Sequence, residues 1–219
     1  THLASSAASD VYKRQTISYA AAAPKSELIP KWEAHNPISQ TVVNHTALDD
    51  FLAKYRYLSA DGIAQIRYNR VTEADKTALN AYVTMLEGIA VSDLNRNEQY
   101  AYWVNLYNAG TLKVVLDYYP VKSIRDINIS PGFFSSGPWG KTFLTVEGSE
   151  ISLDNIEHGI LRPIWRDPRT HYVVNCASIG CPDIPAKALT AANTEDIKEG
   201  AARSYINHRR GVRVSEYGD

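Results

Sequence analysis

The chain has 219 residues, 44% of them hydrophobic, and a formal net charge of −1 at pH 7. A chain of this size and composition can bury the core of one ordinary domain. The near-neutral charge gives no field that would favour nucleic acid or an anionic membrane, and no apolar run approaches the roughly 20 residues of a membrane span.

The first 23 residues form two segments that we expect to lie outside the folded domain. Residues 1–15 have no apolar periodicity and resemble translated adapter sequence from assembled environmental DNA, so we expect them to be non-native or disordered. Residues 16–23 are Ala-rich and resemble the end of a secretory signal peptide, with a linker as the alternative. A signal peptide predicts a periplasmic or secreted protein in an oxidising compartment, where disulfides persist. A single domain is then expected over residues 24–219.

The domain is expected to begin with an arm and two helices. Residues 24–45 contain several prolines and predict an extended arm that is anchored by Trp32 and Ile38. After the arm, capping residues and apolar periodicity predict a helix from Thr46, a short strand or turn over Gly62–Tyr68, and a second helix from Thr72.

Residues 96–118 give the strongest helical pattern in the chain. A start signal precedes them and a proline follows, and the sequence between is apolar nearly all round. We therefore expect a central, buried helix. Asn105 and Asn108 lie one turn apart inside it, and buried amides need hydrogen-bonding partners. They either bond nearby loop backbone or contribute to a site.

The second half of the chain predicts short elements joined by loops. Residues 128–140 are rich in glycine and proline, and Trp139 within them is placed to cap a cleft. Beyond this loop we expect a hairpin, a short helix, a strand, a longer helix and a last strand, over residues 142–153, 154–162, 172–176, 194–208 and 212–214. Helices followed by clustered strands indicate an α+β fold, in which the central helix packs with the others against a small, mostly antiparallel sheet.

Both cysteines lie in one short stretch, His171–Pro182. A predicted strand delivers Asn175 and Cys176, and a turn of small residues brings Cys181 back toward Cys176. Two thiols this close can form a disulfide, provide a catalytic thiolate or join a metal site. The cysteine and histidine spacings do not form a zinc-finger pattern, so we assign no metal and no cofactor.

A catalytic interpretation needs a base beside the thiol and a group that orients the base. Cys176 would be the nucleophile and His158 the base, because strand spacing places His171 on the opposite face and about 16 Å away. Asn105 or Asn108 would orient the imidazole as an amide does in papain-like sites. A buried helix on a small sheet is also loosely like papain and transglutaminase architecture. This interpretation predicts a Cys-dependent hydrolase or acyltransferase.

A Cys176–Cys181 disulfide would instead pin the turn between the cysteines and make the protein a binding module. We favour this interpretation and keep thiol catalysis as the alternative. The expected ligand is an unidentified small molecule or peptide. Polar or aromatic side chains expected to contribute to binding are Asn108, Asn175, Glu157, His171 and Trp139. The remaining histidines sit in polar contexts and are expected at the surface: His35, His45 and His208.

Four motifs are similar to the signature of one family, the domain-of-unknown-function family DUF547. They cover Glu98–Ala109, Tyr119–Ile124, Leu153–Arg162 and His171–Pro182. The resemblance spans roughly residues 30 to 215 and implies an exported domain of the bacterial type. It implies no particular chemistry, because the family has no established activity. Family members continue past the equivalent of Val214, so we expect the domain to be truncated at its C-terminus.

Overall fold

A computed structural model describes residues 25–132 and 136–211; the expectations for residues 1–24 and for the strand at 212–214 lie outside these residues. The described parts contain five α-helices and two two-stranded antiparallel sheets, which confirms the α+β class. The α-helices are α1 (Thr46–Tyr55), α2 (Glu73–Glu87), α3 (Arg96–Tyr118), α4 (Arg162–Trp165) and α5 (Thr194–Ile206). The strands are β1 (Arg56–Leu58), β2 (Ala64–Ile66), β3 (Leu144–Val146) and β4 (Ser149–Ile151).

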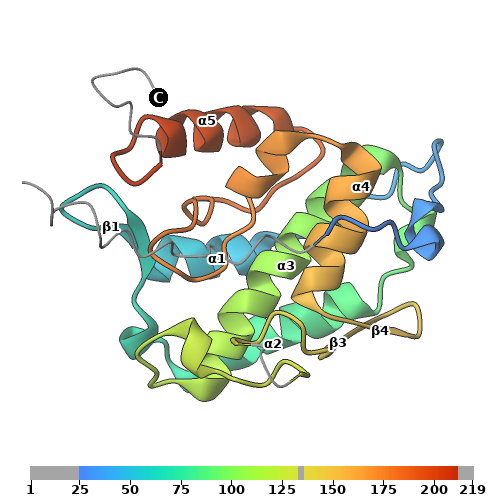
Figure 1. Ribbon diagram of the computed structural model, residues 1–219. Coiled ribbons are helices and arrows are strands. Elements are labelled where there is room, and N and C mark those ends of the chain that lie inside the picture. The colour runs from blue at the N-terminus through green and yellow to red at the C-terminus, as the bar shows by residue number, and fades with distance from the viewer. Residues whose placement is uncertain (1–24, 133–135, 212–219) are drawn as a thin grey trace, which may run out of the picture.

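Helix α3 runs through the middle of the molecule, with the other helices around it (Figure 1). The side chain of Asn95 caps its first turn by accepting hydrogen bonds from two backbone N–H groups. Trp103, at its centre, is fully buried and makes edge-to-face contacts with the rings of Trp32 and Tyr102, each at 5.0 Å between centroids. The central, buried helix is therefore confirmed.

Of the two anchors expected in the N-terminal arm, only one is buried. Trp32 is buried, but the side chain of Ile38 is 81% exposed, so the second expected anchor is wrong. His45, expected at the surface, is only 4% exposed, because its ring turns inward and Nδ1 hydrogen-bonds the hydroxyl of Tyr82 at 2.6 Å. Polar neighbours in the sequence did not reveal that the residue directly before α1 faces the core.

The strands form two separate hairpins instead of one sheet. Strand β1 pairs only with β2, and β3 only with β4, over three residues each. The second hairpin packs closely on α3 at Gly110, where a Cβ would lie 3.3 Å from the Leu153 side chain and 3.4 Å from Leu144. A glycine at this position lets the helix and the hairpin approach one another.

The strand expected over residues 172–176 is wrong. Pro168–Tyr172 forms a 3-10 helix whose N-terminus is capped by the Asp167 carboxylate, and the chain that follows is irregular. The backbone of Val173 and Asn175 bonds the side chain of Asn108 where a strand would bond a neighbouring strand. The expectation that His171 and Cys176 lie on opposite faces of a strand therefore does not apply.

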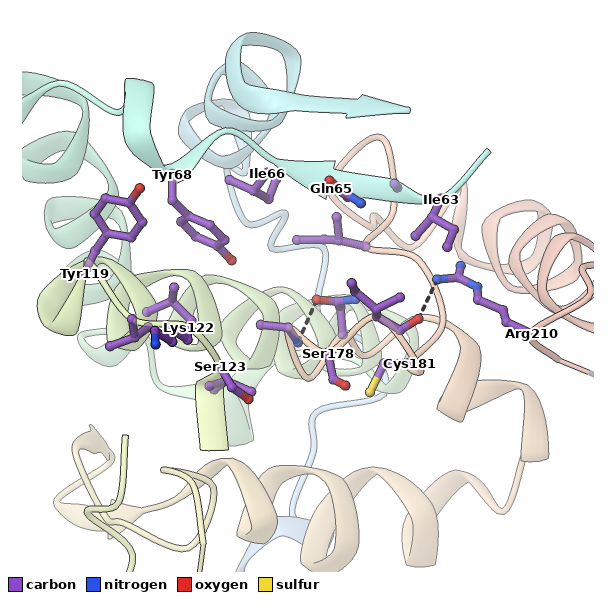
Figure 2. Close-up of a pocket in the computed structure, with 18 residues that line it drawn as sticks. Ile63, Gln65, Ile66, Tyr68, Tyr119, Lys122, Ser123, Ser178, Cys181 and Arg210 are labelled. Atoms are coloured by element: carbon purple, nitrogen blue, oxygen red, sulfur yellow. Dashed lines mark hydrogen bonds between the residues drawn. The ribbon is translucent and has the colours of Figure 1, made fainter. Parts of the chain in front are cut away.

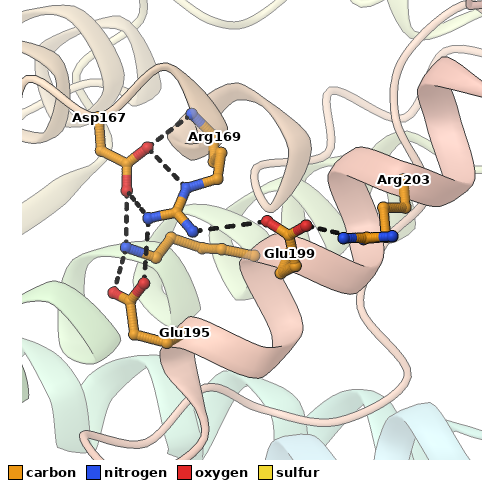
Figure 3. A network of polar contacts seen from close by, with 6 residues as sticks. Asp167, Arg169, Glu195, Glu199 and Arg203 are labelled. Atoms are coloured by element: carbon orange, nitrogen blue, oxygen red, sulfur yellow. Dashed lines mark hydrogen bonds and ion pairs between the residues drawn. The ribbon is translucent and has the colours of Figure 1, made fainter.

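Helix α5 is tied to this 3-10 helix by a network of charged side chains (Figure 3). Arg169 and Lys198 both contact Asp167 at 2.8 Å, and both also contact Glu195. The hydrogen bond from Arg169, reinforced by Lys198, holds the pKa of Asp167 well below its ordinary value. Lys198 is buried, so its carboxylate partners compensate a charge that would otherwise be unpaired. The network connects α5, which contacts the cysteine loop through Tyr205, to the 3-10 helix.

Candidate functional site

Cys176 and Cys181 are paired in a disulfide, with their Cα atoms 6.2 Å apart. Between them the chain makes a tight turn in which Ser178 O accepts a hydrogen bond from Cys181 N. Ala177 holds a left-handed φ of 56°, a conformation that persists when the surroundings enforce it. The residues from Cys176 to Cys181 are called the cysteine loop below.

The side chain of Asn175 closes the base of the cysteine loop. Its Oδ1 accepts a hydrogen bond from Ala177 N at 2.9 Å, and its Nδ2 donates one to Pro182 O at 2.7 Å. The amide therefore links the two ends of the loop independently of the disulfide. Asn175 was expected to bind a ligand, and the structure places it in the loop's own framework as well as in the wall of a pocket.

The two buried amides of α3 bond the backbone on either side of the cysteine loop. Asn108 donates to Val173 O and accepts from Asn175 N, each at 2.9 Å. Asn105 does the same one turn away, donating to Leu189 O at 2.8 Å and accepting from Leu189 N at 2.9 Å. Both amides thus bond loop backbone, which was one of the two expectations for them. Neither amide makes these bonds to an imidazole.

The outer side of the cysteine loop is held by α5 and the residues that follow it. The Tyr205 hydroxyl donates to Gly180 O at 2.7 Å, and Arg210 donates to Ile179 O at 3.0 Å. Arg210 also pairs with Asp183, whose carboxylate accepts a hydrogen bond from Ala64 N in β2. Sequence reasoning missed these anchors. An acid directly after Cys-Pro was a usable signal for Asp183, whereas nothing local marks Tyr205 or Arg210.

A pocket of about 340 Å³ opens beside the cysteine loop (Figure 2). One wall is the loop itself and another is strand β2 with Tyr68 after it. The last turns of α3 and the segment Tyr119–Ile124 complete it. Two of the four family-like motifs, the Tyr119–Ile124 segment and the cysteine motif, therefore meet around one cavity. This volume falls in the range of roughly 300–1,000 Å³ typical of small-molecule sites.

His158 and Glu157 lie on a different element, a seven-residue π-helix, η5 (Asn155–Leu161), that leads into α4. A π-helix is rare and is frequently found at functional sites. The Nδ1 atom of His158 is 2.8 Å from an Arg162 nitrogen and so accepts the hydrogen bond, because guanidinium is only a donor. Nε2 faces Asp154 at 4.0 Å. Burial, with a contribution from Arg162, lowers the pKa of His158, which favours the neutral imidazole.

Glu157 is the acid at the centre of this π-helix cluster. Burial alone would raise its pKa, but contact with His171 at 3.6 Å and the charge of Arg162 hold it below the ordinary value. The fully buried hydroxyl of Tyr107, on α3, also contacts the Glu157 carboxylate, and burial raises the pKa of Tyr107 well above its ordinary value. His171 itself is largely exposed. These side chains form a partly buried polar cluster around an ionised carboxylate.

The N-terminal arm covers one side of the π-helix. Glu27 N donates to His158 O at 3.2 Å, and Ile29 N donates to Gly159 O at 2.9 Å. A Cβ at Gly159 would lie 2.6 Å from the Ile29 side chain, so glycine is needed for this contact. The arm therefore limits access to the helix that carries His158.

The expected site residues thus fall into two groups and one outlier. Asn175, Cys176 and Cys181 belong to the cysteine loop, with Asn108 behind them. Glu157, His158 and His171 belong to the π-helix cluster, and Trp139 reaches its N-terminal end, where its carbonyl accepts a hydrogen bond from Asp154 N at 3.0 Å. Asn105 lies in neither group, because its amide is engaged with Leu189. Within residues 25–132 and 136–211, no three His, Cys, Asp or Glu side chains are arranged to hold a metal ion.

Comparison with known proteins identifies the family of the chain. The model of a family described as "Protein of unknown function, DUF547" matches residues 91–206, which is more than half of the sequence. The match includes α3, the π-helix, the cysteine loop and all of α5. No curated protein and no solved structure matches the chain. In the part of the chain that the structure describes, no helix is long and apolar enough to cross a membrane. The chain belongs to the DUF547 family.

Proposed function

We propose that this domain is an exported binding module that holds a small molecule or a short peptide in the pocket beside the cysteine loop. The observation that carries the proposal is the pocket itself, walled by a loop that is held on every side. The disulfide, the Asn175 amide and the bonds from Tyr205 and Arg210 all fix its shape. A preformed cavity avoids the entropic cost of ordering the protein around its ligand.

Export is supported by two features of the chain. The Ala-rich segment at residues 16–23 resembles the end of a signal peptide. The cysteine pair lies at disulfide distance, and such bonds persist in oxidising compartments. Together they favour a periplasmic or secreted location.

The neutral fluorescent dye N-phenyl-1-naphthylamine tests the binding proposal, because its emission rises in an apolar site. We expect saturable binding of one dye molecule per protein. Val121 lines the pocket and is half-buried, so Val121→Trp should fill the cavity and abolish most of the signal. The matched control is Val42→Trp, because Val42 is 76% exposed and lies away from the pocket. Equal dye binding by both variants would show that the pocket is not the binding site.

The alternative, a Cys-dependent hydrolase or acyltransferase, stays a prediction. It requires Cys176 as a free thiolate and His158 as its base. In this structure Cys176 is bonded to Cys181, and His158 accepts a hydrogen bond from Arg162. Hydrolysis of an activated ester that appears only after mild reduction, and disappears in Cys176→Ser, would favour this alternative.

A further inference from the structure

We propose that the pocket beside the cysteine loop selects an amphipathic carboxylate, a ligand with a short apolar body and one anionic head. This inference rests on the proposed function, since it names the class of ligand for the same pocket. Three features carry it: the sign of the charges that line the pocket, the free hydrogen-bond donors in its walls, and the apolar surface between them.

The charged side chains that line the pocket are Lys122 and Arg210, and no Asp or Glu is among the lining residues. Arg210 is neutralised by its ion pair with Asp183 and donates to Ile179 O, while its buried Nε has no hydrogen-bonding partner among the described residues. Lys122 is exposed and forms no ion pair or hydrogen bond within the described residues. The pocket therefore has one uncompensated positive charge, which a carboxylate would complement.

The uncharged polar groups of the pocket add free donors. Gln65 accepts a hydrogen bond from the Tyr57 hydroxyl at its Oε1, so its Nε2 is left to donate elsewhere. The hydroxyl of Tyr68 has no hydrogen-bonding partner among the described residues and points into the pocket (Figure 2). Burial raises the pKa of Tyr68, so this hydroxyl keeps its proton and remains a donor. An anionic acceptor would bond these donors directly, and a hydrogen bond to a charged acceptor is stronger than one between neutral groups.

Two of the polar groups, Tyr68 and Lys122, lie at one end of the pocket, and Gln65 lies further along strand β2 (Figure 2). Figure 2 shows Tyr68, Tyr119 and Lys122 at the same end, with Cys181 and Arg210 at the other. Ile66 lies between these ends (Figure 2), and the lining also includes the aliphatic side chains of Val115 and Ile184. A molecule with a carboxylate at the tyrosine end could bond the polar groups there, and its aliphatic chain could pack on the aliphatic side chains of the wall. The small volume favours a body of up to about eight carbons over a long lipid tail.

Three eight-carbon probes that differ only in the head group test this inference: octanoate, 1-octanol and octylamine. Each is titrated against the complex of the full chain with N-phenyl-1-naphthylamine, and displacement is measured at low and high salt. We expect octanoate to displace the dye at a concentration roughly tenfold below that of octylamine, with octanol between them. Raising the salt concentration should bring the displacement concentrations of octanoate and octylamine closer together, because Lys122 is exposed and salt screens its charge.

Substitutions at Lys122 separate its charge from its shape. Lys122→Gln should remove the preference for octanoate, and Lys122→Arg should keep it. Lys187→Gln, a change at an exposed lysine outside the pocket, should leave all three titrations unchanged. Octyl phosphate is a fourth probe, and stronger displacement by it than by octanoate would overturn the carboxylate assignment in favour of a phosphate ester.

The remaining outcomes distinguish the two proposals. If the dye binds but octylamine competes as well as octanoate, the ligand class is wrong and the pocket remains a binding site. If the dye does not bind, or if Val121→Trp leaves its binding unchanged, the proposed function fails and the ligand class fails with it.

Discussion

In this molecule, single side chains make the backbone hydrogen bonds that a neighbouring strand would make in a sheet. The carboxamide of Asn108 presents one donor and one acceptor, and both bond the backbone of the segment that leads to Cys176. Asn105 makes the same two hydrogen bonds to the backbone of Leu189. The sequence shows that both amides are buried, but it does not show which backbone they meet, because their partners lie more than 60 residues away.

Replacing Asn108 with alanine should destabilise the fold strongly. The change leaves Val173 O and Asn175 N without these bonds, and each buried group without a partner costs roughly 1–3 kcal/mol. We expect the free energy of unfolding to fall by about 2–4 kcal/mol, measured by urea denaturation. Asn97→Ala, at an exposed position of the same helix, should change it by less than about 0.5 kcal/mol. Equal effects of the two substitutions would contradict the bracing role of Asn108.

His45 should make stability depend on pH. Burial lowers its pKa from 6.5 to about 4 in the folded protein. Between these values the unfolded chain binds the proton and the folded protein does not. The contribution of His45 to the free energy of unfolding is therefore greatest above pH 6.5 and is lost as the pH drops toward 4. The loss from this residue is on the order of 3 kcal/mol.

The test for His45 is the difference between two pH series of urea denaturation. His45→Gln can keep a hydrogen bond to Tyr82 and cannot ionise, so its stability should fall less than that of the unchanged protein between pH 7 and pH 4. The control is His35→Gln at an exposed histidine, which should follow the unchanged protein. Parallel curves for all three proteins would argue against a buried, neutral His45.

Among the elements, α3 was predictable because its signals are local. The Asn95 cap, the proline after the helix and the apolar circumference all lie within or beside it. The segment at 172–176 was not predictable in the same way. A short apolar run fits a strand or any other buried extended chain, and the choice depends on what it packs against. The π-helix is a similar case, because the apolar pattern that predicts a helix does not distinguish a π-helix from an α-helix.

The same helix gives the clearest prediction about stability at the element scale. Trp103 is fully buried and contacts two aromatic rings, so Trp103→Ala should lower the free energy of unfolding by roughly 3–5 kcal/mol. Its indole Nε1 has no hydrogen-bonding partner in the described residues, so Trp103→Phe loses no such bond and should cost clearly less. Thermal denaturation of both variants checks this order. A Trp103→Ala variant with an unchanged midpoint would show that α3 is not the core.

At the scale of the whole molecule, the pocket is the feature that sequence could not foresee. Its walls come from β2, the end of α3, the segment after it and the cysteine loop, which are separated by up to about half of the chain. The prediction that a disulfide pins a turn needed only two nearby cysteines. Placing that turn opposite Tyr68 and Lys122 requires the packing of the whole domain. The cysteine motif could therefore suggest a site, but not where its other walls lie.

The disulfide connects the stability of the molecule to the shape of this pocket, and its reduction should change both. Only five positions separate the cysteines, so closing the loop should contribute about 2 kcal/mol. Reduction should therefore lower the thermal midpoint by roughly 4–8 °C for a protein of this size. Because the cysteine loop forms one wall, N-phenyl-1-naphthylamine should also bind more weakly. Iodoacetamide should label no cysteine before reduction and two afterwards.

A Cys176→Ser, Cys181→Ser double variant supplies the control, since it should match the reduced protein and should not respond to reductant. The Asn175 amide and the Tyr205 hydroxyl still hold the loop after reduction, so we expect weakened binding and not its complete loss. Two results would contradict this account. If reduction left the thermal midpoint and the affinity for the dye unchanged, the hydrogen bonds alone would hold the cysteine loop in its conformation. Two labelled cysteines in the untreated protein would mean that the thiols are free, and the catalytic interpretation of Cys176 would gain.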